Sequence, residues 1–335
     1  MKYLLVLSNG GKKRFYHNYM YSKFSLDRKL SVEITVDDYP DSDKLIKLIN
    51  SLSHSNFDKI FAIGGGSVID IAKVLSVFLP IANQRKIKNL QEEDLDLFKE
   101  KKIHLTAVPT TSGTGAEATQ FATIWDHINL KKYSIDHPSL LPEEFLLDSN
   151  FLNTLSYENF LYPVLDCVSH TLESIWNSNR NASSLILSEK SLKIISNEIG
   201  KLSKHNYKDI DFSKILLASN LAGQAINTTR TSIAHAISYE YTIKQGVPHG
   251  LACSFTIPKI HYFILKEVND AIYKNFLKYT SKIIEHLESL ELLNMVNKFE
   301  KDNTNIIDLS TLNPSRLNTF LVKPSIKTLE DFTNE

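Results

Sequence analysis

Residues 59–73 read KIFAIGGGSVIDIAK, in which two apolar runs are separated by three glycines. The first run, residues 59–63, is short and contains isoleucine and phenylalanine, which predicts a buried β-strand. The second run, residues 68–79, has apolar side chains on two sides and predicts a buried helix. A strand that enters a helix through a glycine turn is the repeating unit of parallel α/β sheets, so this segment indicates the fold of the surrounding chain.

The flanking segments repeat this alternation of strand and helix. Residues 3–8, 32–36 and 103–108 are short apolar runs, and residues 44–52 carry apolar side chains on one helical side. Alternation of this kind predicts parallel strands joined by helical crossovers. We therefore expect an α/β domain with a parallel sheet over residues 1–150.

The pattern changes after about residue 150. Apolar residues recur at spacings of three and four along residues 158–199, 215–226 and 260–293, and no convincing strand pattern accompanies them. This periodicity predicts helices. We therefore expect an all-helical second domain over residues 151–335.

The composition excludes several kinds of protein. Hydrophobic residues make up 42% and charged residues 23% of the 335 positions, and 38 basic side chains balance 38 acidic ones. This balance is ordinary for a soluble globular enzyme. It argues against the charge field of a nucleic-acid-binding protein and against a polybasic membrane surface. Since no apolar run approaches the roughly 20 residues that span a bilayer, we expect a small-molecule substrate and neither nucleic acid nor membrane as a partner.

The N-terminus and the two cysteines indicate the cellular compartment of the protein. Residues 1–8 could be mistaken for a signal peptide, but the apolar stretch is short and NGGKKR follows it in place of a cleavage site. The two cysteines, Cys167 and Cys253, are far apart in segments predicted to be helical. A chain of this size does not need a disulfide, so a reducing cytoplasm is the simplest location.

The glycine turn GGGS at residues 64–67 lies where the predicted helix begins. Unpaired N–H groups and the helix dipole attract anions to this end. Glycines also let a phosphate approach the backbone closely. Because the motif is not G-x-G-x-x-G, a tight turn without a ligand is the alternative.

A second polar turn follows the predicted strand at residues 103–108. It reads PTTSGTGAE over residues 109–117, and every residue from 110 to 115 is hydroxylic or glycine. Small donors at the carboxyl end of a strand suit a ligand crevice in an open α/β sheet, although they could instead cap the following helix. Two such turns on neighbouring strands predict a cofactor cleft more strongly than either turn alone.

The helical half contains residues of the types that bind metals. Asp166 and His170 are four apart in a predicted helix, which places both on one face, and Pro163 fits the first turn of that helix. His235 lies in a later helical stretch, and His249 lies in VPHG, which we predict to be a turn. One carboxylate and three imidazoles can hold Fe²⁺ or Zn²⁺. Spacing alone leaves open the alternative of four separate structural residues.

Together, these motifs resemble those of iron-containing alcohol dehydrogenases. The GGGSVID turn followed by Lys73 is similar to the pyrophosphate turn of that family, and PTTSGTGAE is similar to its nicotinamide-side loop. DCVSHTLES at residues 166–174 matches its D-x-x-x-H metal helix. The Pro-His-Gly sequence at His249, fourteen residues after His235, matches its last two ligands. Order and spacing agree over residues 55–260.

The resemblance implies an α/β dinucleotide-binding domain and an all-helical metal-binding domain, with the active site in the cleft between them. It implies NADPH or NADH as the cofactor and Fe²⁺ as the metal, with Zn²⁺ as the other candidate. The metal ligands that it implies are Asp166, His170, His235 and His249. The cofactor contacts that it implies are Gly65, Gly66, Ser67, Thr110, Thr111, Thr114 and Lys132.

One subgroup of the family is especially similar. The segments at residues 228–239 and 246–254, with FATIWD at residues 121–126, resemble phosphonoacetaldehyde reductases, which make 2-hydroxyethylphosphonate. Arg230 lies five residues before a predicted metal ligand, and its guanidinium could hold a phosphonate in a bidentate manner. A surface or helix-capping arginine is the alternative. Weaker candidates for the same task are Lys132, Arg180 and Lys244.

Three departures from the family pattern are informative. Tyr239 stands where many members have another histidine, so the proton could pass through Tyr239, a ribose hydroxyl or water. The first strand ends in Ser8 and Asn9 rather than in aspartate, and the basic residues 12–14 follow, which favours acceptance of NADPH. The segment that usually precedes this strand in the family, and often contributes to a dimer, is lacking, so a homodimer is left open.

These features predict a metal-dependent, NAD(P)H-linked alcohol dehydrogenase that reduces a small aldehyde, with phosphonoacetaldehyde, in phosphonate biosynthesis, as the preferred substrate. The metal would act as a Lewis acid on the aldehyde oxygen, and hydride would come from the nicotinamide. One alternative is a general alcohol or glycerol-type dehydrogenase of the same superfamily, whose neutral substrate gives Arg230 nothing to bind. The other is a non-catalytic nucleotide-binding relative, which has no need of four metal ligands.

Overall fold

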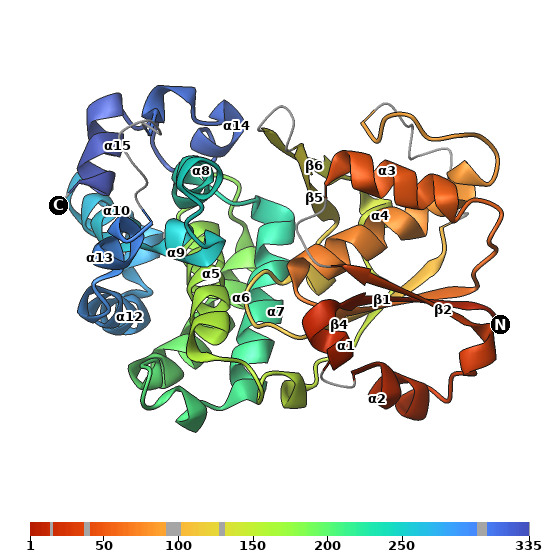
Figure 1. Ribbon diagram of the computed structural model, residues 1–335. Coiled ribbons are helices and arrows are strands. Elements are labelled where there is room, and N and C mark those ends of the chain that lie inside the picture. Colours follow the sequence, from red (N-terminus) through yellow and green to blue (C-terminus); the bar gives the residue numbers. More distant parts are fainter. Residues whose placement is uncertain (14–15, 37–40, 92–101, 127–130, 300–306, 335) are drawn as a thin grey trace. The chain divides into compact units, whose positions relative to one another are not determined.

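The chain forms two compact units, which Figure 1 shows with the element labels used below. The N-terminal unit comprises residues 1–111 and 115–151, and the C-terminal unit comprises residues 112–114 and 152–335. The structure is a computed structural model that describes residues 1–13, 16–36, 41–91, 102–126, 131–299 and 307–334.

The N-terminal unit is built on a five-stranded parallel sheet in the order β2-β1-β3-β4-β7. Its strands are β1 (Tyr3–Ser8), β2 (Ser31–Val36), β3 (Lys59–Gly64), β4 (His104–Pro109) and β7 (Glu144–Phe145). The predicted parallel sheet is therefore confirmed. The sequence did not predict β7, because its two exposed residues form no apolar run.

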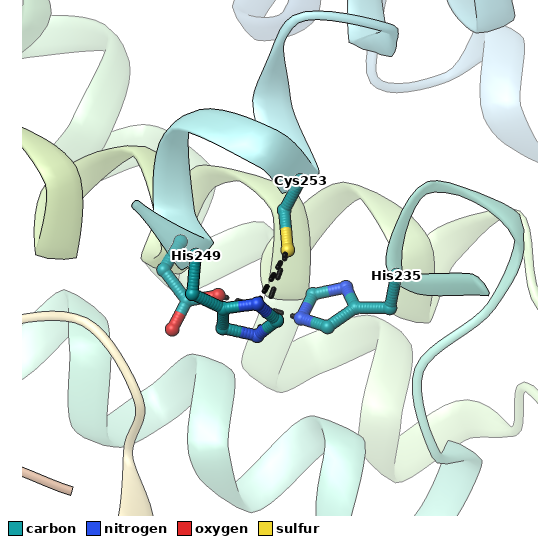
Figure 2. A group of neighbouring side chains, drawn as sticks. His235, His249 and Cys253 are labelled. Carbon is teal, nitrogen blue, oxygen red and sulfur yellow. Dashed lines mark hydrogen bonds and ion pairs between the residues drawn. The ribbon is translucent and has the colours of Figure 1, made fainter. Parts of the chain in front are cut away.

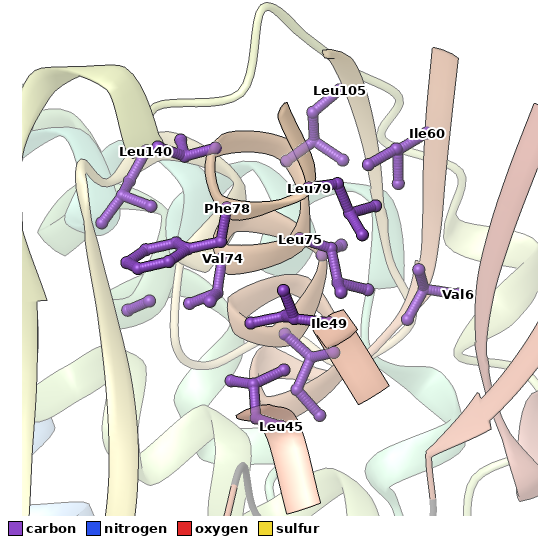
Figure 3. Close-up of a cluster of buried hydrophobic side chains, with 14 of the residues drawn as sticks. Val6, Leu45, Ile49, Ile60, Val74, Leu75, Phe78, Leu79, Leu105 and Leu140 are labelled. Carbon is purple, nitrogen blue, oxygen red and sulfur yellow. The ribbon is translucent and has the colours of Figure 1, made fainter. Parts of the chain in front are cut away.

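Helix α4 (Gly66–Ala82) lies in the hydrophobic core of this unit. The side chains of α4 are buried along nearly the whole length of the helix, as the two-sided apolar pattern predicts. Helix α3 (Ser42–Ser51) packs against α4 and buries Leu45 and Ile49 in the same core. Figure 3 shows this cluster, in which β1, β3 and β4 contribute Val6, Ile60 and Leu105.

Two further strands, which the sequence did not predict, form an antiparallel ribbon in the N-terminal unit. They are β5 (Phe121–Asp126) and β6 (Lys131–Asp136). Ala122, Ile124 and Ile135 are buried, and most of the described side chains between them are more exposed. The only sequence signal was therefore a partial alternation over six residues, which is weaker than the continuous apolar run of a buried strand.

The C-terminal unit contains helices and, in its described residues, no named strand. This confirms the predicted helical second part of the fold. Helix α5 (Tyr157–Ile175) is its centre and packs against α6 (Ala182–Glu198), α7 (Phe212–Thr229) and α9 (His249–Ser254). The side chains of α5 are buried almost without a break after its first turn, because neighbouring helices cover it on several sides.

The remaining helices are shorter. Two π-helical turns, Tyr241–Gln245 and Ile264–Val268, follow α8 and α10. Within the described ranges, we find no helix with the length and apolar character needed to cross a bilayer. The remaining α-helices are α1 (Asn9–Lys13), α2 (Tyr16–Lys23), α8 (Ile233–Glu240), α10 (Ile257–Phe263), α11 (Ala271–Lys274), α12 (Leu277–Ser289), α13 (Leu292–Asn297), α14 (Pro314–Leu317) and α15 (Ile326–Thr333).

Pro163 lies in the interior of α5, so its predicted place in the first helical turn is wrong. The helix begins earlier because Ser156 caps it, its hydroxyl accepting a hydrogen bond from the Asn159 N–H at 3.3 Å. Gly113 approaches this proline so closely that a Cβ on it would lie 2.5 Å from the Pro163 carbonyl oxygen. Only glycine fits at position 113, which explains one glycine of the PTTSGTGAE segment.

Candidate functional site

Helix α5 contributes two of the predicted metal ligands. Asp166 and His170 are four residues apart on this helix, and both side chains are buried. The Nε2 atom of His170 lies 3.5 Å from Oδ1 of Asp166. The Nδ1 atom of His170 lies 3.3 Å from the Gly113 carbonyl oxygen, which can fix the orientation of the ring. The helical spacing therefore brings the two groups together as the sequence indicated.

Two other helices bring the remaining predicted ligands to the same place. His235 lies on α8, and its Nε2 atom is 3.3 Å from Oδ1 of Asp166. Its ring stacks on His170 with centroids 4.7 Å apart and meets His249 edge-on at 5.3 Å. Ligand atoms of Asp166, His235, His249 and Cys253 all lie within 4.8 Å of one another. Figure 2 shows His235, His249 and Cys253 turned toward a common point.

His249 is the first residue of helix α9, so its predicted place in a turn is wrong. The preceding residue, Pro248, is the N-cap of α9, and Gly246 has a left-handed φ of +74° that ends the π-helical turn. In the sequence, a proline and a glycine on either side of a histidine predict a turn. Here they mark the junction of two helical segments, and the junction directs His249 toward the cluster.

Burial and neighbouring charges determine the protonation of these groups. Burial would raise the pKa of Asp166, but the histidines around it, His170 first, lower that pKa well below its usual range. Burial lowers the pKa of His170 to about 4, so this imidazole is neutral at pH 7. Burial would lower the pKa of His235 as well, but Cys253 and Glu173 raise it. A bound cation would displace the proton on His235, because metal ligands must be deprotonated.

Two donor atoms of the cluster have no hydrogen-bond partner among the described residues. They are Oδ1 of Asp166 and Nε2 of His235, both on side chains that are less than 5% exposed. Buried polar atoms without partners are costly and rare in proteins. A divalent cation between them would satisfy both, and a carboxylate with imidazoles suits iron or zinc. The residues therefore fit a metal ion of this type.

Glu173 is a residue of this site that the sequence analysis missed. It is fully buried on α5 and accepts a hydrogen bond from the His235 backbone N–H at 3.0 Å. Its Oε2 atom lies 2.5 Å from Nδ1 of His235. A carboxylate on one ring nitrogen directs the other nitrogen toward a metal. A signal existed, because residue 173 is seven positions after Asp166 and shares its helical face.

The substitution Glu173→Gln tests this positioning role. The amide keeps the shape of the side chain but loses its charge, so we expect Zn²⁺ affinity to fall about 10- to 100-fold. Competition with a chelating dye measures that affinity in the metal-free protein. Glu198→Gln is the matched control, since Glu198 is also a buried glutamate of the C-terminal unit but pairs with Lys201 at 2.8 Å. Equal affinities in the two variants would contradict the role of Glu173.

The two polar turns predicted from the sequence begin side by side in the N-terminal unit. Gly64 and Pro109 are paired in register at the ends of β3 and β4, and the Thr110 N–H donates to the Gly64 carbonyl at 3.0 Å. Gly65 is the N-cap of α4 and makes no side-chain cap. A Cβ on Gly65 would lie 3.3 Å from Oγ1 of Thr111. The N-terminus of a long helix beside the Thr111 hydroxyl group suits an anion such as a pyrophosphate.

The other predicted cofactor contacts are more scattered. Gly66 and Ser67 form the first turn of α4. On β6, the ammonium group of Lys132 lies 5.1 Å from the Trp125 ring. Thr114 belongs to the C-terminal unit, unlike the rest of the set.

Arg230 lies at the C-terminal end of α7 with a φ of +66°, which is rare for a residue other than glycine. Its Nη1 atom donates to the carbonyl of Asn227 in the same helix. The structure thus shows a helix-capping contact, which the sequence analysis gave as the alternative role. Arg180, a weaker candidate, is held by Asp270 in a bidentate pair with N···O distances of 2.7 and 2.9 Å.

The remaining basic residues singled out in the sequence lie in both units. Lys244 was a candidate for binding the phosphonate, and residues 12–14 were the basic residues that favour NADPH. Lys244 makes an ion pair of 2.5 Å with a glutamate one helical turn earlier. Lys12 lies 3.7 Å from the carboxylate of Glu33. Arg14 and the side chain of Lys13 lie outside the described residues.

The fold and the cluster define a two-part protein, with a parallel α/β unit that carries a glycine-turn helix and a helical unit that carries a cluster of a carboxylate and imidazoles that fits a metal ion. A family model for iron-containing alcohol dehydrogenase matches residues 2–149, and a model for the C-terminal part of the Fe-containing alcohol dehydrogenase family matches residues 160–301. The chain belongs to the iron-containing alcohol dehydrogenase family.

Three known proteins illustrate the similarity. Phosphonoacetaldehyde reductase from Streptomyces viridochromogenes is 28% identical over 237 residues, which are 70% of this chain and 60% of that protein. An iron-containing alcohol dehydrogenase from Thermotoga maritima superposes with a TM-score of 0.77 at 23% identity, covering 99% of this chain and 90% of that chain. Sulfoacetaldehyde reductase from Bifidobacterium kashiwanohense, solved with NAD⁺, gives a TM-score of 0.78 at 15% identity and the same coverages.

These similarities establish the family and the fold. The matches span only 53% to 60% of the length of the first curated relatives. The two solved structures are less than 25% identical to this chain, so their likeness shows the fold alone.

Proposed function

We propose that the protein is a metal-dependent reductase of a small aldehyde that uses NADPH or NADH. The observation that carries this proposal is the buried cluster of Asp166, His235 and His249, whose ligand atoms lie within 4.8 Å of one another. Two of these ligand atoms are buried without hydrogen-bond partners in the described structure, which a purely structural role would not require. Membership of a family of dehydrogenases supports the same reading.

The metal centre would use the four ligands that the sequence indicated. Fe²⁺ is the metal in the family's name, and Zn²⁺ suits the same donors. When bound, such an ion supplies a Lewis acid that polarises the aldehyde carbonyl. Asp166, His170, His235 and His249 would hold it, and the contact with Glu173 would keep Nε2 of His235 directed at it.

The cofactor would bind at the two polar turns. Gly65, Gly66 and Ser67 would offer backbone N–H groups to the pyrophosphate at the start of α4, with Thr110 and Thr111 adjacent. Thr114 and Lys132 would complete the set of contacts. Acceptance of NADPH is supported by Ser8 at the end of β1, since an uncharged residue stands there in place of an aspartate that would repel a 2′-phosphate. We expect both reduced cofactors to be used.

The proton for the product alcohol would come from Tyr239. Its ring lies nearly parallel to that of His249, with an interplanar angle of 11° and a centroid distance of 6.1 Å. The phenol therefore stands beside a predicted metal ligand, where a general acid could reach a developing alkoxide. Tyr239 takes this role in the proposal because the family's additional histidine is replaced by tyrosine here.

The preferred substrate in this proposal is phosphonoacetaldehyde. The similarity to a protein named phosphonoacetaldehyde reductase supports it. Arg230 would hold the phosphonate, because a guanidinium can bind two phosphonate oxygens at once. The contact with the Asn227 carbonyl would then give way to the substrate, since a charge-assisted pair is stronger than a neutral acceptor.

The substitution Arg230→Ala tests the substrate. A charge-assisted bidentate contact is worth about 1.5 to 3 kcal/mol, so we expect KM for phosphonoacetaldehyde to rise roughly 10- to 100-fold. The KM for propanal, which is neutral, should stay within about twofold because it makes no use of the guanidinium. Arg28→Ala removes an exposed arginine of the N-terminal unit and is the control. An unchanged KM for phosphonoacetaldehyde would remove Arg230 from the site.

The same assay separates the alternative functions. Loss of reduced-cofactor absorbance with a panel of aldehydes, with Fe²⁺ or Zn²⁺ added, reports activity directly. Equal efficiency on neutral aldehydes and phosphonoacetaldehyde would favour a general alcohol or glycerol-type dehydrogenase. No oxidation of either cofactor with any aldehyde, in protein that binds the metal, would favour a non-catalytic relative.

A further inference from the structure

Cys253 lies among the predicted metal ligands, although the sequence motifs did not include it in the ligand set. It is fully buried on α9, one helical turn after His249. Its Sγ atom is 3.7 Å from both ring nitrogens of His249. This sulfur and ligand atoms of Asp166, His235 and His249 form one group, in which all atoms lie within 4.8 Å of one another. Figure 2 shows Cys253 beside His249 and His235.

The spacing of these atoms fits one cation. Ligands held at about 2.0 to 2.3 Å from a tetrahedral ion lie about 3.3 to 3.8 Å from one another. The Asp166–His235 pair at 3.3 Å and the Cys253–His249 pair at 3.7 Å both match this separation. Oδ1 of Asp166 and Nε2 of His235 are also among the buried side-chain atoms that lack a hydrogen-bond partner in the described structure. These two atoms and the sulfur therefore lie close enough together to share one cation.

We propose that Cys253 binds the divalent metal through its thiolate, together with Asp166, His235 and His249. This inference rests on the proposed metal centre and adds a ligand that the family resemblance did not supply. On binding, the S–H bond breaks, a sulfur–metal bond forms and the proton leaves to solvent. Because burying uncompensated charge is costly, a thiolate and a carboxylate that together neutralise a 2+ ion make this buried site more stable than one carboxylate alone.

The proposal predicts which metals the site prefers. Thiolates favour softer ions such as Zn²⁺, Co²⁺ and Fe²⁺ over Mg²⁺ and Mn²⁺. His170 is not among the four ligand atoms of that set, and its Nδ1 atom faces the Gly113 carbonyl. The Nε2 atom of His170 lies 3.5 Å from Oδ1 of Asp166, so His170 stays next to this group and keeps its place as a ligand in the proposed centre.

The test uses cobalt, whose complexes report sulfur ligands by absorption. Metal-free protein is loaded with Co²⁺ under anaerobic conditions, and we expect a strong thiolate-to-cobalt charge-transfer band in the near ultraviolet. Cys253→Ser should lose this band while keeping the weaker visible cobalt bands. Cys167→Ser is the matched control, because Cys167 is the other buried cysteine and is not among the four ligand residues. That variant should keep the charge-transfer band.

The outcomes separate this inference from the proposed function. Visible cobalt bands without charge transfer in the unaltered protein would overturn thiolate ligation while leaving the metal centre in place. No cobalt bands of any kind would overturn the metal centre itself. Zn²⁺ affinity, measured by chelator competition, should fall at least about 10-fold in Cys253→Ser, and an unchanged affinity counts against the proposal. If the serine variant fails to fold, Cys253→Ala provides the same comparison.

Discussion

Replacing His249 with alanine is expected to remove the bound metal and to lower kcat/KM for aldehyde reduction by about 10³-fold or more. A metal acting as a Lewis acid supplies several kcal/mol of stabilisation to the developing alkoxide, and about 1.4 kcal/mol corresponds to each factor of ten in rate. His249 is also only partly buried, whereas Asp166 and His235 are fully buried. Its loss should therefore disturb the fold less than the loss of either of those ligands.

Metal content after exhaustive dialysis and steady-state kinetics with NADPH measure this effect. His205→Ala is the matched control, because His205 is an exposed histidine of the same unit. We expect it to keep both the metal and the activity. A His249→Ala variant that retains full metal content and full activity would show that the cluster is not the metal centre, and the reductase proposal would fall with it.

Gly250→Ala is expected to destabilise the C-terminal unit by about 4 kcal/mol or more, enough to prevent soluble expression of a marginally stable protein. A Cβ on Gly250 would lie 1.8 Å from the Tyr162 carbonyl oxygen, 2.7 Å from its carbon and 3.1 Å from the Asp166 nitrogen. All three atoms belong to the backbone of α5, so no side-chain rotation relieves the clash. The glycine allows α9 to lie directly against α5, and this contact places His249 beside Asp166.

Chemical denaturation and the thermal melting temperature measure this loss. Gly200→Ala is the matched control, because a Cβ there meets no atom within 4 Å among the described residues. We expect it to change the free energy of unfolding by less than about 1 kcal/mol. If Gly250→Ala folded with normal stability and normal metal content, the close approach of α9 to α5 would not be required for the site.

Three strands of the sheet were predictable because each is a short apolar run that is buried on both faces. β1, β3 and β4 have this character, and the glycine turn at residues 64–67 separates β3 from α4 as the sequence indicated. The ribbon of β5 and β6 was missed because it buries only part of its side chains. A six-residue alternation is too short to distinguish such a strand from a loop.

Part of the candidate site was predictable because the geometry within one helix is local. Asp166 and His170 are neighbours because four residues make about one helical turn, and this holds wherever the helix lies. Glu173 shares that face, so its nearness to the pair could also have been inferred. Its contact with His235 could not, since the distance between residues on different helices depends on how those helices pack.

The sequence by itself determined the family, the order of β1, β2, α3, β3, α4 and β4 in the first half, and the local pairs that helical periodicity enforces. Only the tertiary structure decided that α5, α8 and α9 converge, that His249 begins a helix, and that Cys253 joins the ligand atoms. Periodicity acts over one or two turns of chain, whereas convergence depends on steric fit between surfaces distant in sequence. Gly250 gives one example, because the lack of a side chain there lets α9 lie against the backbone of α5. The proposed metal chemistry depends on this close packing.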